Sequence, residues 1–157
     1  MAQLIINKVH SLLAKKRKTI AVAESCTGGL VSELLTRLPG SSKFFALAVV
    51  TYANQAKEDL LSIPSSLLAK RGAVSQGVAL RMAHAVRLLA GADLALGITG
   101  IAGPGGATAR KPVGTVFIAL ESAHMKICRR FTFKGNRTRV RISAAQAALR
   151  LVQEALT

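Results

Sequence analysis

The chain has 157 residues, half of them hydrophobic, which is enough for one domain with a substantial core. Its 22 lysines and arginines outnumber 7 acidic residues and give a formal net charge of +15, which favours an anionic partner: nucleic acid, a phosphorylated small molecule or a membrane surface. With no Trp, one Tyr and five Phe, the sequence offers few rings for stacking unpaired bases, which disfavours a dedicated single-strand binder. We therefore expect a single domain over residues 1–157.

The first 18 residues predict an amphipathic helix that ends in a basic run at residues 15–18. A secretory signal has its positive charge before the apolar stretch, so this order argues against one. No apolar stretch approaches the roughly 20 residues that a membrane span requires. The alternative is a basic amphipathic helix that lies on a membrane, but we favour a first helix docked on the core with a solvated basic C-terminus and expect no membrane association. The apolar face of the helix is expected to contain Leu4, Ile5, Val9, Leu12 and Leu13.

The two cysteines, Cys26 and Cys128, lie far apart and have no nearby cysteine or histidine at a metal-ligand spacing. Neither a disulfide framework nor a zinc site is therefore indicated. We expect a cytoplasmic protein with no metal and no cofactor.

Residues 19–38 predict a buried strand, a polar turn and a helix. The turn, Glu24-Ser25-Cys26-Thr27-Gly28-Gly29, would leave backbone N–H groups at a helix N-terminus, where an anion or a polarised carbonyl can be held. It also contains two nucleophiles, a serine and a cysteine. The alternative is that the serine and threonine only cap the helix.

Strands and helices alternate along the rest of the chain and end in an antiparallel hairpin before a last helix. The almost wholly apolar run 44–52 predicts a strand buried on both faces. Together these elements predict a three-layer α/β/α domain with a mixed, mostly parallel central sheet. The other expected elements are helices 54–62, 64–70, 76–90 and 137–156 and strands 94–99, 115–122 and 126–133.

Loops that leave the carboxyl ends of parallel strands converge on one edge of such a sheet, where ligands usually bind. The loops 24–29, 51–57 and 99–111 would bring together Ser25, Tyr52, Asn54, Lys57 and Thr99. A desolvated lysine can take the proton of a serine hydroxyl near neutral pH, so Ser25 and Lys57 form a candidate dyad. The alternative for Lys57 is a solvated charge on a short helix.

Other familiar chemistries fit the sequence poorly. None of the three histidines falls beside a glycine-rich loop, so a Ser-His-Asp triad has no obvious members. The acidic residues are too scattered for paired-carboxylate chemistry or a carboxylate metal cage. The glycines of residues 97–106 match neither dinucleotide-binding nor P-loop spacing.

Five stretches of the sequence, taken together and in order, form a recognisable set. They are Ala23-Glu24-Ser25-Cys26-Thr27-Gly28-Gly29, Thr51-Tyr52-Ala53-Asn54-Gln55-Ala56-Lys57, Gly72-Ala73-Val74-Ser75, Ile98-Thr99-Gly100-Ile101-Ala102-Gly103-Pro104 and Lys111-Pro112-Val113-Gly114-Thr115-Val116. The set is similar to the CinA C-terminal domain family, whose characterised members are nicotinamide-nucleotide amidases. The similarity covers nearly the whole chain and implies the three-layer mixed-sheet fold, no metal, and hydrolysis of the carboxamide of nicotinamide mononucleotide to nicotinate mononucleotide and ammonia.

The resemblance implies that Ser25 is the nucleophile and Lys57 the base, with Tyr52 nearby. We expect backbone N–H groups near Gly28 to stabilise the oxyanion. Arg137, at the start of the last helix, is our choice for contacting the substrate phosphate, because arginine suits bidentate phosphate recognition. The full set of expected substrate-binding residues is Thr27, Gly28, Thr99, Gly100, Gly103 and Arg137.

The sequence departs from the family pattern in two places. Gln76 follows the Val-Ser pair, where the family often has glutamate, and the segment Gly105–Arg110 lacks the acidic residues that the family usually carries there. These departures bear on loop conformation and substrate preference more than on reaction type.

We therefore expect a hydrolase acting on a phosphorylated pyridine nucleotide. The alternatives are a basic nucleic-acid-binding or accessory protein without turnover, and an inactive nucleotide-binding relative. Any nucleic-acid binding should be non-specific, because it would rest on the net positive charge. A homo-oligomer is compatible with the sequence.

Overall fold

A computed structural model describes residues 2–157, with six α-helices and five strands. The predicted order of elements is confirmed. The elements are α1 (Ala2–Lys16), β1 (Ile20–Glu24), α2 (Leu30–Thr36), the short 3-10 helix η1 (Ser41–Lys43), β2 (Phe45–Val50), α3 (Asn54–Leu61), α4 (Ser65–Arg71), α5 (Gln76–Ala90), β3 (Leu94–Gly100), β4 (Thr115–Ser122), β5 (Lys126–Thr132) and α6 (Arg137–Leu156).

The five strands form one mixed sheet in the order β2-β1-β3-β4-β5. β1 pairs in parallel with β2 and β3, whereas β3–β4 and β4–β5 are antiparallel pairs. Only β4 therefore runs against the other four strands, as expected for a mostly parallel sheet that ends in a hairpin. The carboxyl ends of β1, β2 and β3 meet at the same edge of the sheet.

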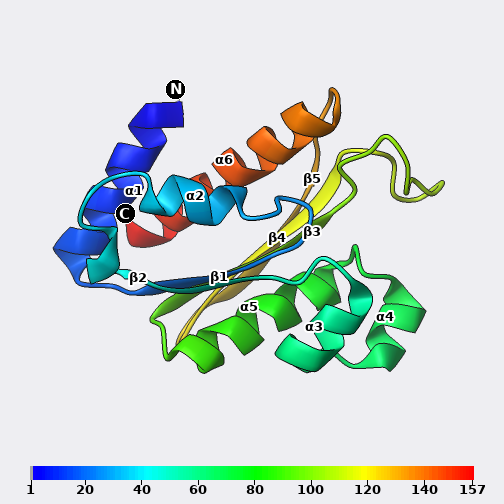
Figure 1. Cartoon of the computed structure of the whole chain (residues 1–157), viewed down its shortest axis with the longest axis horizontal. Coiled ribbons are helices and arrows are strands. Elements are labelled where there is room, and N and C mark those ends of the chain that lie inside the picture. The colour runs from blue at the N-terminus through cyan, green and yellow to red at the C-terminus, as the bar shows by residue number, and fades with distance from the viewer. Residues whose placement is uncertain (1) are drawn as a thin grey trace.

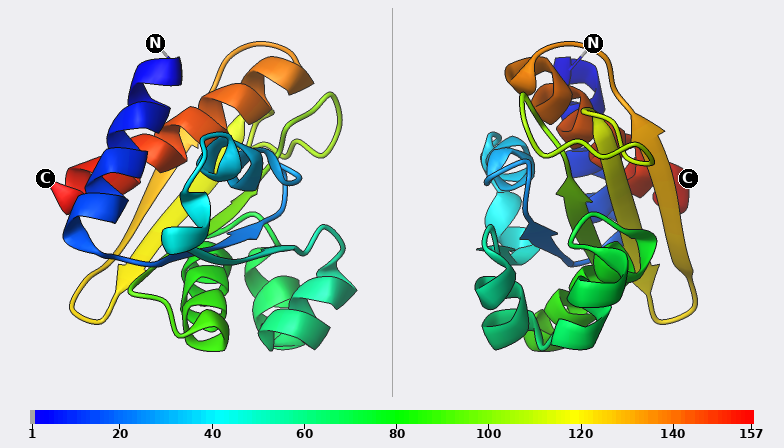
Figure 2. Two further views of the ribbon diagram at one scale, coloured as in Figure 1. Left: turned by 60° about the vertical axis from the view of Figure 1, so that its left-hand side comes forward. Right: turned by 90° about the vertical axis from the view of Figure 1, so that its right-hand side faces the viewer.

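Helices cover both faces of the sheet, which gives the expected three layers (Figure 1). α1, α2 and α6 lie on one face, and α3, α4 and α5 lie on the other. Figure 2 shows the long loop between β3 and β4, in yellow-green, projecting past the end of the sheet where α6 begins. No helix within residues 2–157 combines the length and apolar composition that crossing a membrane requires.

β2 corrects one prediction. We expected a strand buried on both faces, but most of its side chains are only partly buried and Val50 is 46% exposed. The physical reason is its place in the sheet: β2 is an edge strand and pairs only with β1. An apolar run marks a strand, but it does not distinguish an edge from the centre.

The predicted face of α1 also needs correction. Leu4 is exposed, and the helix instead packs through Ile6, Val9 and Leu13, which are spaced by three and four residues. This spacing is the one that places side chains on the same side of a helix. Leu89 in α5 and Ile142 in α6, which hydrophobicity also marks as candidate core residues, are likewise exposed.

α5 lies unusually close to β3. A Cβ atom added at Gly97 would lie 2.2 Å from the carbonyl oxygen of Ala79 and 2.5 Å from the backbone nitrogen of Ala83. Only glycine permits this approach between the middle of the sheet and the helix. α5 begins as predicted at Gln76, and Ser75 caps it: the Ser75 Oγ accepts a hydrogen bond from Val78 N at 3.4 Å.

Candidate active site

A cavity of about 180 Å³ lies at the edge of the sheet where β1, β2 and β3 end. Its walls come from five separate parts of the chain, which the topology brings together. The lining residues are Ser25, Cys26, Tyr52, Asn54, Lys57, Ala73, Val74, Thr99, Gly100, Ala102 and Arg137.

Ser25 and Lys57 face each other in this cavity. Lys57 Nζ donates a hydrogen bond to Ser25 Oγ at 3.0 Å, and the lysine residue is only 1% exposed. Lys57 and Leu61 are one turn apart in α3, and both point inward. The solvated-lysine alternative is therefore wrong for this structure.

Burial makes the Lys57 amine easier to deprotonate than an exposed lysine. Burial lowers the pKa of the Lys57 amine, and no carboxylate lies within ion-pair distance of it in the described chain. Its other contacts are the carbonyl oxygens of Thr51 at 2.6 Å and Tyr52 at 3.2 Å. A neutral amine has two N–H donors and one lone pair. The two carbonyls take two of its directions, and the third points at Ser25 Oγ, to which the protonated amine donates. In the neutral amine this third direction is the lone pair, which can accept the hydroxyl proton of Ser25.

Cys26 lines the same cavity, but its environment disfavours the reactive thiolate. Burial raises the pKa of the Cys26 thiol to about 12. The thiolate is the nucleophilic form of cysteine, so near neutral pH this side chain stays a protonated thiol. The electrostatics therefore separate the two adjacent nucleophiles and favour Ser25.

The N-terminus of α2 is occupied by Glu24, and this corrects the expected oxyanion site. The fully buried Glu24 carboxylate accepts hydrogen bonds from Gly29 N, Val31 N and both the N–H and hydroxyl of Ser32. The Gly28 N–H is also engaged, because it donates to Ser25 O at 3.1 Å. The backbone N–H groups of Gly28, Gly29, Val31 and Ser32 are therefore already used by the protein itself.

The capping alternative for Ser25 is wrong as well. The N-cap of α2 is Gly29, with a φ of 94° and no side-chain cap. Glu24 supplies the acceptors that a capping hydroxyl would otherwise provide. This leaves the Ser25 hydroxyl to its contact with Lys57.

Arg137 connects two loops at the mouth of the cavity. Its guanidinium donates to Gly103 O at 2.9 Å and to the hydroxyl of Tyr52 at 2.7 Å. Tyr52, predicted near the dyad, contacts Lys57 only through its backbone carbonyl, and its side chain is largely exposed. The phenol therefore meets Arg137 rather than the Ser25–Lys57 pair.

The remaining expected residues divide into two groups. Thr99 and Gly100 line the cavity, and Thr99 Oγ1 donates to Ala73 O at 2.8 Å. Thr27 and Gly28 do not line it. The Thr27 side chain is buried, and its carbonyl accepts a hydrogen bond from Arg141 at 2.8 Å.

Arg141 also constrains Gly28, where an added Cβ would lie 3.3 Å from its guanidinium nitrogen. Gly103, likewise outside the lining, participates through the carbonyl that Arg137 holds. These three positions, Thr27, Gly28 and Gly103, therefore support the walls rather than form them.

Reasoning from side-chain chemistry missed Ala73, Val74 and Ala102, which form the apolar part of the wall. Small apolar residues carry no chemical signal of their own. Their only signal was their presence in the stretches that resemble the family.

No group of three or more potential metal ligands occurs among residues 2–157.

The fold and the buried pair define a three-layer α/β protein with a serine–lysine site at the carboxyl edge of its sheet. The sequence profile of the CinA C-terminal domain matches residues 2–156, and the chain belongs to this family. The resemblance read from the five stretches is thereby confirmed.

Relatives of known sequence support this assignment. A CinA-like protein of Syntrophus aciditrophicus is 49% identical over 149 residues, and one of Geobacter metallireducens is 51% identical over 141 residues. These alignments cover 94% and 90% of this chain but 36% and 34% of the relatives. The chain thus spans about a third of the length of the curated relatives it matches.

Solved structures match over nearly their whole length. A CinA superfamily protein from Klebsiella pneumoniae has a TM-score of 0.95 at 31% identity, with 99% of this chain and 98% of that one covered. A competence/damage inducible protein from Agrobacterium tumefaciens has a TM-score of 0.94 at 35% identity, with 99% and 94% covered. The expected α/β/α fold is confirmed.

Proposed function

We propose that the chain is an amidase that hydrolyses the carboxamide of nicotinamide mononucleotide to nicotinate mononucleotide and ammonia. The observation that carries this proposal is the contact of 3.0 Å between Ser25 Oγ and the buried amine of Lys57. A serine becomes an effective nucleophile when an adjacent base takes its proton, and a lysine with a lowered pKa can be that base.

The reaction begins with attack of Ser25 Oγ on the carboxamide carbon while Lys57 accepts the hydroxyl proton. The tetrahedral intermediate then collapses as the protonated lysine gives its proton to the leaving nitrogen, and ammonia departs. Water attacks the resulting acyl-enzyme, with Lys57 again taking a proton. The second tetrahedral intermediate collapses as Lys57 gives this proton to Ser25 Oγ, which releases the acid product and restores both Ser25 and the neutral amine.

The oxyanion needs a donor other than the N-terminus of α2, which Glu24 occupies. We assign this role to the backbone N–H of Cys26, the residue that follows the nucleophile and lines the cavity. Within residues 2–157 this N–H has no carbonyl or carboxylate partner on another residue. A donor at this position that no other residue uses can stabilise charge that develops on the carboxamide oxygen.

The size of the cavity bears on how a nucleotide would bind. Its 180 Å³ is below the roughly 300–1,000 Å³ typical of whole-ligand pockets, so it suits the carboxamide end of a substrate. The ribose phosphate would then extend outward past Arg137. The substrate phosphate would replace the Tyr52 hydroxyl as the hydrogen-bond partner of Arg137 and would form a charge-assisted bond with its guanidinium.

The test is ammonia release from nicotinamide mononucleotide, nicotinamide riboside and free nicotinamide, measured in parallel. We expect the phosphorylated substrate to give the highest kcat/KM, and Arg137→Gln to raise its KM by about tenfold with little change for the riboside. No ammonia from any of the three, together with DNA binding that weakens steeply with salt, would favour the non-enzymatic alternative.

A further inference from the structure

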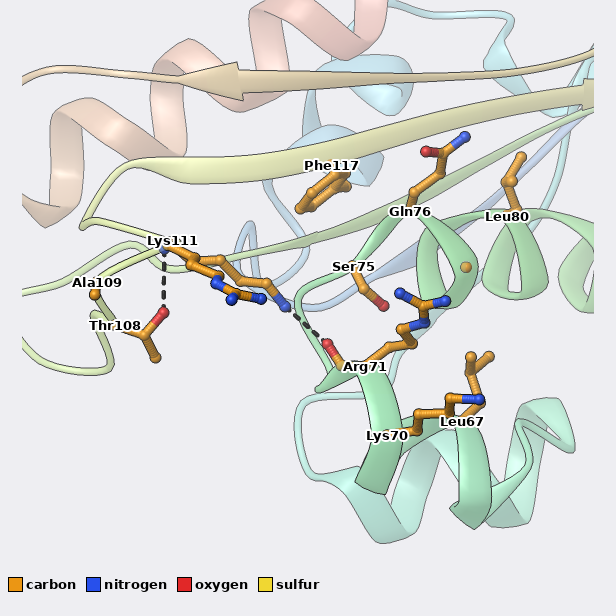
Figure 3. Close-up of a pocket in the computed structure, with 12 residues that line it drawn as sticks. Leu67, Lys70, Arg71, Ser75, Gln76, Leu80, Thr108, Ala109, Lys111 and Phe117 are labelled. Atoms are coloured by element: carbon orange, nitrogen blue, oxygen red, sulfur yellow. Dashed lines mark hydrogen bonds between the residues drawn. The ribbon is translucent and has the colours of Figure 1, made fainter.

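A second and larger cavity lies between α4, the first turns of α5 and the loop 104–112. Its volume is about 850 Å³, within the range of pockets that hold a whole small-molecule ligand. Figure 3 shows the residues of α4 and of the loop on opposite sides of this space, with Phe117 of β4 between them. The lining residues are Leu67, Lys70, Arg71, Ser75, Gln76, Gly77, Leu80, Thr108, Ala109, Arg110, Lys111 and Phe117.

All the charged residues that line this cavity are cations. Lys70, Arg71, Arg110 and Lys111 contribute four cations, and no acidic residue is among the lining residues. In the part of the chain that the structure describes, none of the four forms an ion pair with a carboxylate. Cations gathered in a concave site without acids create a strongly positive potential, which a polyanion would neutralise.

The loop that carries Arg110 and Lys111 is held in place by side chains that donate hydrogen bonds to backbone carbonyls. Lys111 Nζ donates to Arg71 O at 2.7 Å, which links the loop to the end of α4 (Figure 3). Arg130 donates to Arg110 O at 2.7 Å, and its guanidinium lies over the Phe117 ring, 5.7 Å from the centroid. The side chains of Arg71 and Arg110 make no hydrogen bond within the described chain and are free for a ligand.

The rest of the cavity suits a flat, partly apolar group. Leu67, Leu80 and Phe117 supply an apolar surface, and beside them lies Gln76, whose amide has no protein partner among residues 2–157. An amide offers both a donor and an acceptor, which is what the edge of a nucleobase requires. Both departures from the family pattern, Gln76 and the acid-free segment 105–110, fall on this cavity and make it less negative.

This cavity is distinct from the one that contains Ser25. Ala73 and Val74 line the Ser25 cavity, whereas Ser75 lines the larger one, so the segment 72–75 forms the wall between them. Thr99 Oγ1 fixes that wall through its hydrogen bond to Ala73 O. A ligand held by the four cations would therefore lie on the side of the wall away from Ser25.

We propose that the cavity bounded by α4, α5 and the loop 104–112 is a second ligand site, which binds a nucleoside polyphosphate. The four cations receive the phosphates, and the apolar surface and Gln76 receive the base.

The experiment is isothermal titration calorimetry of the whole chain at about 150 mM salt, where long-range attraction is screened. ATP, inorganic triphosphate and adenosine are titrated separately. We expect saturable binding of ATP, with triphosphate at least about tenfold weaker and adenosine undetectable. Equal affinity for ATP and triphosphate would overturn the nucleoside assignment, and no saturable binding of ATP would overturn the site.

Three variants locate the binding. Arg71→Gln with Arg110→Gln should weaken ATP binding by about tenfold or more, as expected for losing charge-assisted hydrogen bonds to phosphate. The matched control, Lys8→Gln with Arg150→Gln, removes two exposed cations from α1 and α6 and should change affinity by less than about twofold. Equal weakening in both double variants would show non-specific attraction and overturn the proposal.

The third variant, Arg137→Gln, tests the Ser25 cavity. We expect it to leave ATP affinity unchanged. A loss of affinity in Arg137→Gln but not in the Arg71–Arg110 variant would place ATP beside Ser25 and refute a second site.

Discussion

Glu24 and Lys57 are two buried ionisable residues at the same edge of the sheet, but their partners give them different properties. Glu24 accepts four hydrogen bonds, three of them from backbone N–H groups at the start of α2. Lys57 contacts two backbone carbonyls and the hydroxyl of Ser25. Both residues are almost fully shielded from water. Burial alone therefore does not mark a reactive group.

The difference lies in what each partner can do. The N–H groups around Glu24 belong to the backbone and cannot exchange a proton with it, so they fix the carboxylate and the turn that contains Ser25. The Ser25 hydroxyl beside Lys57 can lose its proton, and the lowered pKa of Lys57 prepares the amine to accept it. In the mechanism proposed above, the first contact set organises the site and the second supplies the chemistry.

The largest expected effect is on Ser25 itself. Ser25→Ala should lower kcat for ammonia release by about 10³-fold or more, because removing a nucleophile leaves only binding and oxyanion stabilisation. Cys26→Ala is the matched control and should keep most of the activity, since burial raises the pKa of its thiol to about 12. An active Ser25→Ala with an inactive Cys26→Ala would move the nucleophile by one residue.

Lys57→Met should cause a loss similar to that of Ser25→Ala, because it removes the base while approximating the side-chain volume. The double variant should be at most about threefold worse than either single variant, since residues that act as one unit are not additive. Multiplicative losses in the double variant would instead indicate that Lys57 binds substrate.

In the wild type, kcat/KM should rise with pH through the lowered pKa of Lys57.

Glu24→Gln should act on stability more than on chemistry. The amide would place an NH₂ group among donors, and we expect the free energy of unfolding to fall by about 2–4 kcal/mol, measured by urea denaturation. Glu33→Gln, at an exposed surface pair with Arg37, should have little effect. A stable Glu24→Gln that has lost its activity would give Glu24 a direct part in catalysis.

The smallest expected effect is the pH dependence that Lys57 adds to stability. Its pKa is lower in the folded chain than its ordinary value of 10.5, so the unfolded chain binds more protons between these two pKa values. The free energy of unfolding of the wild type, measured relative to Lys57→Met, should therefore increase as the pH rises through this window. If the difference in the free energy of unfolding between the wild type and Lys57→Met is flat or decreases with pH, burial does not lower the pKa of the amine.

The sequence predicted the fold more completely than the site. Alternation of apolar runs with helical spacing was enough for the three layers, and the predicted bounds 76–90 match those of α5. The exposure of β2 could not be predicted, because strand order depends on pairing between distant segments. Local periodicity also does not fix how far a helix is rotated, which is why Leu4 was placed in the core.

At the site, the topology brought Ser25, Lys57 and Thr99 together as the convergence of strand ends predicts. The role of Glu24 was missed because its partners are backbone N–H groups, which every sequence has. The position of the Tyr52 hydroxyl was also not predictable, because it depends on Arg137, 85 residues further along the chain.

The contact between Gly97 and α5 limits how the specificity of this protein could be engineered. A helix that already touches the backbone of the sheet cannot move inward, and any side chain at Gly97 would push it outward. The wall at residues 72–75 leads directly into that helix, so its displacement would disturb the Ser25 cavity. A library that tests the proposed amidase on new amides should therefore keep Gly97 and vary Ala73, Val74 and Ala102, whose side chains can change the cavity without moving its frame.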